Sequence, residues 1–416
     1  MHQRAHTAVL AASGLLVAGT AILTVAGPLS PPAGPVASTS KTLTEVEPRT
    51  PISALPLTIS QPGSYYLTRD LSVASGDAVI VASADVTIDL NGFTLRNAGT
   101  ANRGISAAVT STGLRVRNGS IRGFATHGIL SDAPATEIEA VRVTTLVGAA
   151  DGIRLTGSQS RIAECAAEGP TPVGTGDGLV ASGESSAVES STAAGFDVGI
   201  ACGANAVVAG CRVSGCVTGI STVVAARVVD CIASLNTGAG FNLADASSVA
   251  GCVARENATG FNIGIASSVT GCTARLNSGA GFAGLTNSVA IACAAYDNGF
   301  TGFNLGSTTL LSRCISSANG NNGMTVGGDS FIEGSTCDGN AATGIALNNN
   351  DARIEGNTLT DNATGLSTSA GGNIILRNTA SGNTTADWAI GGTNSFGQII
   401  TSGPIATNNP WSNFSY

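Results

Sequence analysis

The chain has 416 residues, of which 55 are glycine, 11% are charged and 4% are aromatic. Its formal net charge is −8, and no basic patch is present, which argues against nucleic acid as a partner. No series of long apolar spans follows the N-terminal segment, so the composition excludes a helical membrane protein with many spans.

Residues 1–27 are predicted to direct export. A short basic start precedes a stretch from residue 7 to residue 27 that carries no charge. This order is typical of an export signal, and we expect cleavage near Gly27. A stretch of about 20 residues is also long enough for a membrane anchor, so retention is the alternative. In either case we expect the rest of the chain in the periplasm, at the cell surface or outside the cell, with membrane contact only through an uncleaved segment.

The next two segments lead into the main body of the protein. Residues 28–56 are rich in Pro, Ser and Thr, and we predict a flexible tether. Residues 57–97 alternate apolar and polar side chains, as in Val86-Thr87-Ile88, which is typical of strands. We therefore assign residues 57–97 to an N-terminal cap and the first coil of a repeat.

Residues 98–385 are organised by a repeated Gly-hydrophobe pair. The first three steps between pairs are 24, 24 and 26 residues, and every later step is 20 or 21. A fixed period of this size indicates stacked units, each of which buries its apolar face against its neighbours. Strand-type alternation without a sustained helical period predicts an all-β fold. We predict a single-stranded right-handed parallel β-helix solenoid of about 13–15 coils, spaced by about 4.8 Å. The glycines of the pairs are Gly104, Gly128, Gly152, Gly178, Gly199, Gly219, Gly240, Gly260, Gly281, Gly302, Gly323, Gly344 and Gly365.

Two further columns keep the same period. An asparagine recurs every 20 to 22 residues, and a small inward slot lies five residues before it. We expect the asparagines at tight turns, where Asn tolerates left-handed backbone angles, with their amides hydrogen-bonded in a stacked row. The glycines are expected to give the turns their unusual angles. The asparagines are Asn236, Asn257, Asn277, Asn298, Asn319, Asn340, Asn362 and Asn383, and the cysteines in the slot include Cys231, Cys252, Cys272, Cys293 and Cys314.

Ten cysteines in an exported protein would ordinarily suggest disulfides. Seven of them share the inward slot, so their Cβ atoms would lie about 4.8 Å apart, beyond the roughly 3.5–4.5 Å that a disulfide prefers. We therefore expect buried free thiols that act as small hydrophobes. Oxidised pairs and a column of ligands for a soft metal are the alternatives, although the clustered spacing of a metal site is missing.

The last segment, residues 386–416, is predicted to close the repeat. It contains both tryptophans, together with Phe396, Phe414 and Tyr416. A solenoid needs such a cap because its open end presents unpaired strand edges.

Several segments resemble a known group of proteins. Residues 57–67, 86–95 and 117–124 resemble the N-terminal part of exported bacterial right-handed β-helix repeat proteins. Residues 352–357 and 362–366 are similar to the carbohydrate-binding and sugar-hydrolase repeats of the pectin-lyase superfamily, and to periplasmic β-helix proteins of copper-enzyme maturation. The resemblance implies the fold more than the function, because the superfamily contains lyases, hydrolases, epimerases and non-catalytic adhesins.

The candidate site falls on the early coils, where the coil lengths are irregular. Ionisable residues are dense between residues 103 and 164, and an insert follows at residues 169–174, where solenoids commonly grow binding loops. Turn aspartates and a solvated outer face explain the same residues without chemistry. If the protein is an enzyme, the candidate catalytic residues are Arg103, Arg115, Arg117, His127, Asp151 and Asp177.

The resemblance adds two kinds of chemistry for this cluster. Polysaccharide lyases of the superfamily abstract a proton with Arg or Lys and neutralise the substrate with Ca²⁺ on acidic groups. Polygalacturonases use adjacent aspartates and a histidine, and Thr126-His127-Gly128 is similar to their histidine motif. However, the chain has no Asp-Asp pair and lacks the basic motif that clamps the substrate. Apart from Ca²⁺ in the lyase case, we expect no cofactor and no metal.

We predict an exported, non-catalytic solenoid that binds an extended polysaccharide or another component of the cell envelope. Few charges lie between residues 184 and 330, and such a flat face suits contact with a glycan. The alternative is a lyase, hydrolase or epimerase acting on uronate-rich polysaccharide over residues 103–178. A scaffold for copper-enzyme maturation is a third hypothesis, disfavoured by the single histidine outside the N-terminal segment. An enzyme requires ionisable groups that converge on one face of neighbouring coils, and a lyase requires Arg103, Arg115, His127 and Asp151 to be on that face.

Overall fold

The computed structural model describes residues 47–146, 148–170, 173–284, 286–402 and 409–416. The predicted export segment, residues 1–27, and most of the predicted tether lie outside these residues. The chain divides after Pro48, and residues 49–416 form one compact unit. The described part of the chain contains no helix that is long and apolar enough to cross a membrane.

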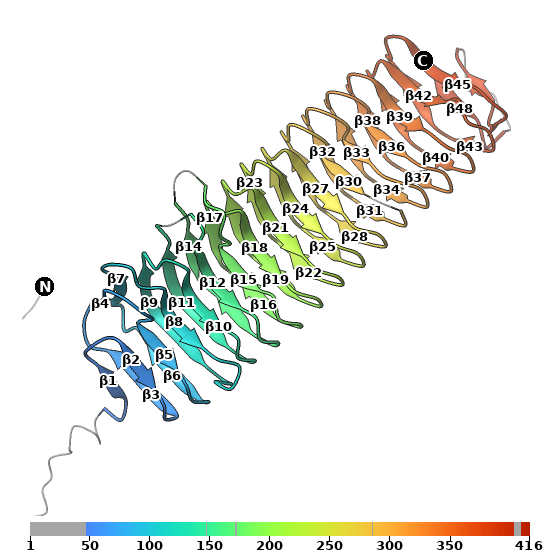
Figure 1. The fold of residues 1–416 in the computed structure, drawn as a ribbon. Helices are drawn as coiled ribbons and strands as arrows, with labels where there is room; N and C mark the ends of the chain where they lie inside the picture. The colour runs from blue at the N-terminus through green and yellow to red at the C-terminus, as the bar shows by residue number, and fades with distance from the viewer. Residues whose placement is uncertain (1–46, 147, 171–172, 285, 403–408) are drawn as a thin grey trace, which may run out of the picture. The chain divides into compact units, whose positions relative to one another are not determined.

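Residues 49–416 form an all-β parallel solenoid, as predicted, with no α-helix among the described residues (Figure 1). One face of every coil belongs to a sheet of 16 strands, here called sheet B. The solenoid therefore has 16 coils, and the three that carry β2, β5 and β45 lack the Gly-hydrophobe pair. Sheet B contains β2 (Leu57–Ile59), β5 (Val79–Val81), β8 (Arg103–Ala107), β10 (His127–Ser131), β12 (Asp151–Leu155), β15 (Leu179–Ala181), β18 (Val198–Cys202), β21 (Thr218–Thr222), β24 (Ala239–Leu243), β27 (Thr259–Ile263), β30 (Phe282–Gly284), β33 (Phe303–Asn304), β36 (Met324–Val326), β39 (Thr343–Leu347), β42 (Thr364–Thr368) and β45 (Ala386–Ile390).

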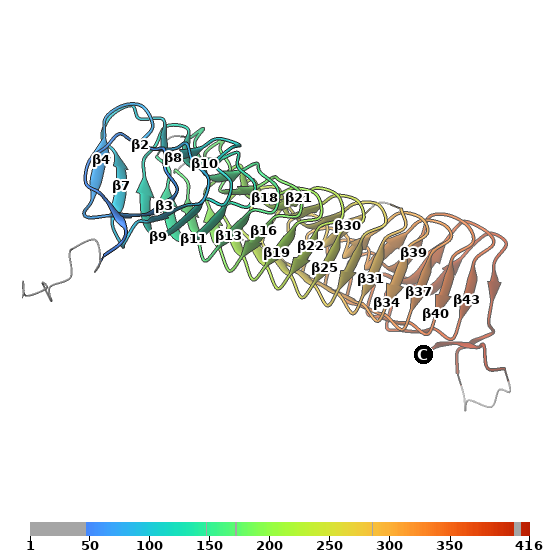
Figure 2. The same ribbon diagram turned by 90° about the horizontal axis from the view of Figure 1, so that it is seen from below.

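The other two faces of the coil belong to a sheet of 32 strands, here called sheet A (Figure 2). Two long strands, β9 (Arg115–Arg122) and β11 (Glu137–Thr144), run through both faces. The first face contains β1 (Thr50–Ile52), β3 (Gly63–Leu67), β6 (Val86–Asp89), β13 (Arg161–Ala163), β16 (Ala187–Glu189), β19 (Val207–Ala209), β22 (Arg227–Val229), β25 (Ser248–Ala250), β28 (Ser268–Thr270), β31 (Val289–Ile291), β34 (Leu310–Ser312), β37 (Phe331–Glu333), β40 (Arg353–Glu355), β43 (Ile374–Leu376) and β46 (Ser395–Phe396). The second face contains β4 (Leu71–Val73), β7 (Thr94–Asn97), β14 (Ala166–Glu168), β17 (Thr192–Ala194), β20 (Arg212–Ser214), β23 (Ile232–Ser234), β26 (Val253–Arg255), β29 (Thr273–Arg275), β32 (Ala294–Tyr296), β35 (Ile315–Ser317), β38 (Thr336–Asp338), β41 (Thr358–Thr360), β44 (Thr379–Ser381), β47 (Ile399–Ile400) and β48 (Asn413–Ser415).

The core is a set of identical positions stacked along the axis. In sheet B the residue after each repeated glycine points inward, and four of these positions are phenylalanine. Their rings stack face to face, with centroids 4.6 to 4.7 Å apart and planes within 7° of each other. Apolar burial on this scale is the main stabilising force of the unit.

The asparagine column forms a buried amide ladder, but its residues do not adopt left-handed angles. The residue before each Asn takes that conformation, as Leu276 does with a φ of 56°. This leaves the Asn side chain free to point inward, so that Asn277 accepts hydrogen bonds from the backbone N–H and the Nδ2 of Asn257, at 3.0 and 3.1 Å. In turn, Asn277 Nδ2 donates to Asn298 Oδ1 at 2.9 Å.

The repeated glycines also have a different role from the one expected. They are absent from the positions with positive φ, so they supply no unusual turn angle. Instead, a Cβ on Gly240 would lie 2.7 Å from Asn257 Nδ2 and 2.9 Å from the carbonyl oxygen of Gly260. Glycine is therefore required for the close approach of successive coils beside the amide ladder.

All ten cysteines are buried and free. In the inward slot, the Sγ atoms of Cys231, Cys252 and Cys272 each accept a hydrogen bond from the backbone N–H of the slot residue in the previous coil, at 3.3 to 3.4 Å. Burial raises the pKa of Cys165 to about 11 and that of Cys202 to about 12. Both thiols are therefore protonated near neutral pH.

The two ends of the unit differ in how they are closed. The solenoid begins inside the segment predicted as a tether, because β1 pairs with β3 and Ile52 is only 1% exposed. At the C-terminus, β48 returns to pair with β44. Its Asn413 accepts a hydrogen bond from the N–H of Asn378 at 2.9 Å and so extends the inward slot by one more coil.

Candidate functional site

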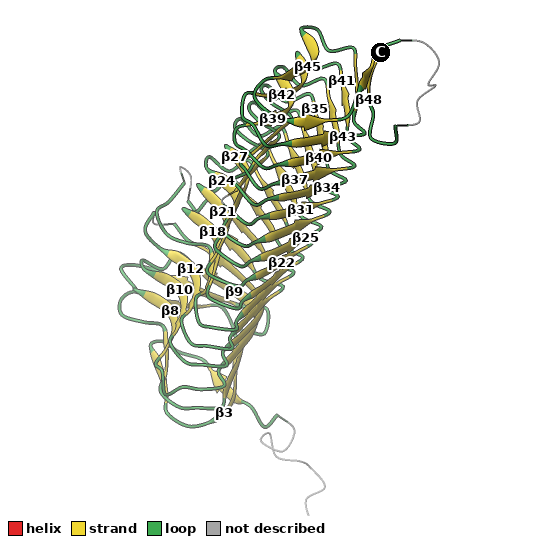
Figure 3. Cartoon of the chain, turned by 90° about the vertical axis from the view of Figure 1, so that its right-hand side faces the viewer, coloured by secondary structure: helices red, strands yellow, loops and turns green. Residues whose placement is uncertain are grey.

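In the coils that begin with β10 and β12, most of the extra length lies at one corner, where the second face of sheet A leads into sheet B. The described residues 145–146, 148–150, 169–170 and 173–178 occupy this corner in the early coils, whereas residues 195–197 suffice in the next coil. In the coil that begins with β8, most of the extra length lies in residues 108–114, between sheet B and β9. The longer loops are tied together, since the N–H of Gly176 donates to the carbonyl oxygen of Gly148 at 2.9 Å. Figure 3 shows that the loops next to β8, β10 and β12 project beyond those of the later coils.

A row of ionisable side chains lies on the outer face of sheet B, directly after these loops. Arg103, His127 and Asp151 are register partners on β8, β10 and β12. Asp177, two residues before β15, extends the row on one side, and Asp77, two residues before β5, extends it on the other, at 3.5 Å from Arg103 Nη1. Four of the six predicted residues are therefore brought together, on successive coils of one sheet.

Asp151 is the centre of this row. Its Oδ2 lies 3.1 Å from Nε2 of His127 and accepts a hydrogen bond from Nε of Arg154 at 2.6 Å. Its Oδ1 accepts from the backbone N–H of Asp177 at 2.8 Å. Arg154 also donates to Asp177 Oδ2 at 3.1 Å, and so bridges the two carboxylates. Arg154 is not among the predicted site residues, although it occupies the next outward position of the same strand.

The surroundings set the ionisation of the two carboxylates in opposite directions. Burial alone would raise the pKa of Asp151, but hydrogen bonds from His127, Arg154 and the Asp177 backbone outweigh it and lower that pKa to about 2. Burial, followed by repulsion from Asp151, raises the pKa of Asp177. Asp151 is therefore a fixed anion that holds His127 and Arg154, whereas Asp177 retains a proton more readily than an ordinary aspartate.

Two polar atoms of the row have no hydrogen-bond partner among the described residues. They are Nε of Arg103 and Nδ1 of His127, and both are buried. The two residues are register partners on adjacent strands. Buried polar atoms without a hydrogen-bond partner are uncommon in folded proteins, and here two of them lie on adjacent strands of the site.

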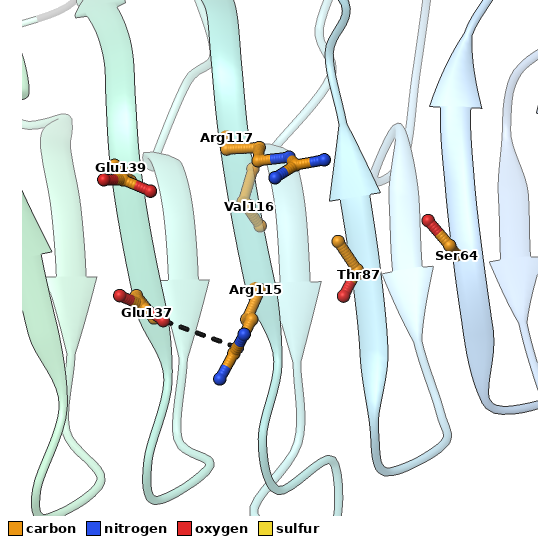
Figure 4. Close-up of a pocket in the computed structure, with 7 residues that line it drawn as sticks. All are labelled: Ser64, Thr87, Arg115, Val116, Arg117, Glu137 and Glu139. Carbon is orange, nitrogen blue, oxygen red and sulfur yellow. Dashed lines mark ion pairs between the residues drawn. The ribbon is translucent and has the colours of Figure 1, made fainter. Parts of the chain in front are cut away.

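Arg115 and Arg117 do not belong to this site, because they lie on β9 of sheet A. They line a separate groove of about 380 Å³ (Figure 4). Arg115 Nε lies 3.4 Å from Glu137 Oε2, and Arg117 Nη2 lies 3.3 Å from Asp89 Oδ2. The lyase hypothesis requires Arg115 on the same face as Arg103, His127 and Asp151, and this condition is not met. On β9 these two arginines form ion pairs with neighbouring coils.

A hollow of about 370 Å³ lies beside the row, on the outer face of β5, β8 and β10. Ser106 is a small residue that lies between the larger Ile80 and Leu130 in a cross-strand row. Asp77 and Arg103 lie at one end of the hollow, and Asp132 also lines it.

The outer face of sheet B changes character from β15 onward. No charged side chain occupies its outward rows between β15 and β45 in the described residues. Some of the polar groups contact each other, as Asn262 Nδ2 does by donating to Asn242 Oδ1 at 2.9 Å. One outward row consists of Val180, Ala201, Ser221, Asn242, Asn262, Ala283, Asn304, Thr325, Ala346, Ser367 and Ala389.

The described residues contain no group of three or more His, Cys, Asp or Glu side chains arranged to hold a metal ion. The three acidic residues of the row are engaged with Arg103, His127 and Arg154 instead.

No protein-family model matches the sequence, and no curated protein sequence matches it. Among solved structures, the Dettilon tailspike protein aligns over 68% of this chain and 62% of its own, at 12% identity and a TM-score of 0.42. The A-module of the Azotobacter vinelandii mannuronan C-5 epimerase AlgE4 aligns over 75% and 90%, at 13% identity and a TM-score of 0.41. A mutant of the periplasmic alginate epimerase AlgG aligns over 80% and 83%, at 13% identity and a TM-score of 0.30. The chain thus spans less than two thirds of the tailspike, and the likeness to all three concerns the parallel solenoid fold alone.

Proposed function

We propose that the outer face of sheet B binds an extended polysaccharide, and that the protein does so outside the cytoplasm. The observation that carries this proposal is the long, uncharged strip of Ser, Thr, Asn and Ala side chains from β15 to β45. The strip leads without interruption into the charged row and the hollow of the early coils.

Hydroxyl and amide groups suit this role because each can exchange hydrogen bonds with the hydroxyl groups of a sugar. Successive coils place equivalent groups about 4.8 Å apart, so a long ligand meets the same chemistry repeatedly. Many weak contacts in series give useful affinity when the surface is rigid and already formed. The buried ladders beneath sheet B supply that rigidity.

A catalytic role for the charged row is the second candidate, and one observation favours it. His127, Asp151 and Asp177 converge on one sheet, and the two carboxylates have pKa values displaced in opposite directions. Such a displacement is a common basis for dividing acid and base roles between two groups. In this case the enzyme would be a polysaccharide hydrolase or epimerase, because a lyase would require Arg115 on the same face as Arg103, His127 and Asp151.

The experiment uses the full chain with an array of neutral and acidic polysaccharides, including pectate, alginate and hyaluronan, with and without Ca²⁺. Retained glycan is measured together with new reducing ends and unsaturated ends. We expect retention without new ends, and we expect Asn262→Trp on the strip to weaken it. The matched variant Ser317→Trp, on sheet A, should retain glycan as the wild type does. Failure to retain any polysaccharide overturns the proposal, and new chain ends assign the protein to the catalytic alternative.

A further inference from the structure

We propose that the hollow on β5, β8 and β10 holds one uncharged sugar ring, so the polysaccharide bound at this end is neutral and not uronate-rich. This inference rests on the proposed function and adds the class of sugar. It reverses the substrate expected for the catalytic alternative.

The shape of the hollow follows from one small residue. Ser106 lies between Ile80 and Leu130 in the outward row that crosses β5, β8 and β10. Because its side chain is short, the surface dips between two larger apolar side chains. The resulting volume of about 370 Å³ is at the lower end of the range for small-molecule pockets. A sugar ring can rest its C–H groups on Ile80 and Leu130.

Polar groups around the hollow match the hydroxyl groups of such a ring. Asp132 Oδ1 accepts a hydrogen bond from Thr156 Oγ1 at 2.7 Å, which fixes the carboxylate. Its Oδ2 has no partner among the described residues and can accept from a hydroxyl group. Arg103 contacts Asp77 only at 3.5 Å, and its Nε is unpartnered. A hydroxyl group both accepts and donates, so it can satisfy an arginine and a carboxylate together.

The charge of the surroundings excludes a uronate from this position. Four carboxylates, those of Asp77, Asp132, Asp151 and Asp177, lie on this part of sheet B, against the two guanidinium groups of Arg103 and Arg154. Arg154 is occupied by Asp151 and Asp177. A uronate carboxylate in the hollow would therefore meet the carboxylates of Asp77 and Asp132, with Arg103 as the single arginine that lines the hollow. Like charges at short range disfavour binding, so the site selects against acidic sugars.

The test measures the affinity of the full chain for matched neutral and uronate hexasaccharides by calorimetry. Ser106→Phe fills the hollow from its floor, and Ser317→Phe, at an outward position of sheet A, is the control. We expect the wild type to prefer a neutral hexasaccharide, and Ser106→Phe to lower that affinity by about tenfold or more while the control does not. Asp132→Asn tests the same contact without added volume, and Asp132→Lys should shift the preference toward the uronate.

The outcomes separate the two proposals. A wild type that binds the uronate more tightly overturns the inference, as does unchanged neutral affinity in both Ser106→Phe and Asp132→Asn. If neutral glycan binds and only Asn262→Trp on the strip weakens it, the proposed function stands and the hollow is not the site. If no hexasaccharide and no polysaccharide binds, both proposals fail.

Discussion

The coils from β18 to β42 and the coils that carry β8, β10 and β12 have the same three faces but treat polar side chains differently. In the later coils, many corners bury an Asn, Cys, Ser or Thr side chain that hydrogen-bonds to a neighbouring coil, and the outer face of sheet B carries no charged side chain among the described residues. In the early coils, the asparagine ladder is replaced by longer loops, and ionisable side chains gather outside.

This difference indicates that stability and recognition depend on different coils of the same solenoid. An amide ladder forms only if every coil supplies an asparagine at the equivalent position, so the ladder demands a nearly constant period of 20 to 22 residues. A binding or catalytic site needs different side chains next to one another, and the longer early coils provide them. Stability should therefore depend most on the regular coils and recognition on the early ones, and four predictions test this division.

The largest effect is expected for Gly260→Ala in the regular coils. The new Cβ would lie 2.3 Å from the carbonyl oxygen of Gly281 and 3.0 Å from Asn277 Nδ2. Since backbone atoms cannot move aside, we expect the free energy of unfolding to fall by about 4 kcal/mol in chemical denaturation. Gly271→Ala is the control, because its Cβ would meet nothing within 4 Å and only its φ of 61° is unfavourable. It should cost about 1 kcal/mol, and equal losses in both variants would contradict the close-approach role.

The next effect is expected for Asn277→Ala, which interrupts the amide ladder. The substitution leaves the N–H of Asn257 without its partner in the core and removes one of the two donors to Oδ1 of Asn298. Buried groups of this kind cost about 1–3 kcal/mol each, so we expect a total loss of about 3 kcal/mol by denaturation. Asn262→Ala removes an amide on the exposed outer face and should cost less than about 0.5 kcal/mol. A small loss for Asn277→Ala would show that water or a backbone shift repairs the ladder.

In the early coils, we expect Asp151 to make the free energy of unfolding depend on pH. Its pKa is lowered from 3.8 to about 2 in the folded state, so its contribution is present above pH 3.8 and is lost as the pH falls toward 2. A shift of this size corresponds to about 2 kcal/mol. We expect Asp151→Asn to be less stable than the wild type at pH 7 by about that amount, and the gap to close between pH 4 and pH 2. A gap that stays constant over this range would contradict the ionic role of Asp151.

The sequence predicts the regular coils well because periodicity alone identifies them. The stacking of Phe261 on Phe282 and the burial of the cysteines follow directly from residues that recur at the same step. The backbone conformations at the corners cannot be predicted from the repeat. Asn tolerates the left-handed conformation well, so the sequence suggests that Asn itself adopts it. Only the structure shows that Leu276 takes this angle so that Asn277 can turn inward.

The site is harder to predict because it depends on register between unlike residues. Arg103, His127, Asp151 and Asp177 each directly precede a repeated glycine, and this position is the first outward one of sheet B. That signal is present in the sequence and would have separated them from Arg115. The pairing of Arg154 with both aspartates depends on side-chain geometry and is visible only in the fold.

The smallest effect should come from Cys252→Ser, which tests whether the thiol column belongs to the ladder system. Serine occurs naturally in this slot, where Ser335 Oγ accepts a hydrogen bond from the N–H of Cys314 at 3.1 Å. A hydroxyl at position 252 can accept from the N–H of Cys231 in the same way, so we expect a change below about 1 kcal/mol. Cys252→Val keeps the volume but removes the acceptor, and should lose about 2 kcal/mol in the same denaturation experiment. If Val is as stable as Ser, the sulfur atoms only fill space, and the hydrogen-bonded corner is not a general property of the regular coils.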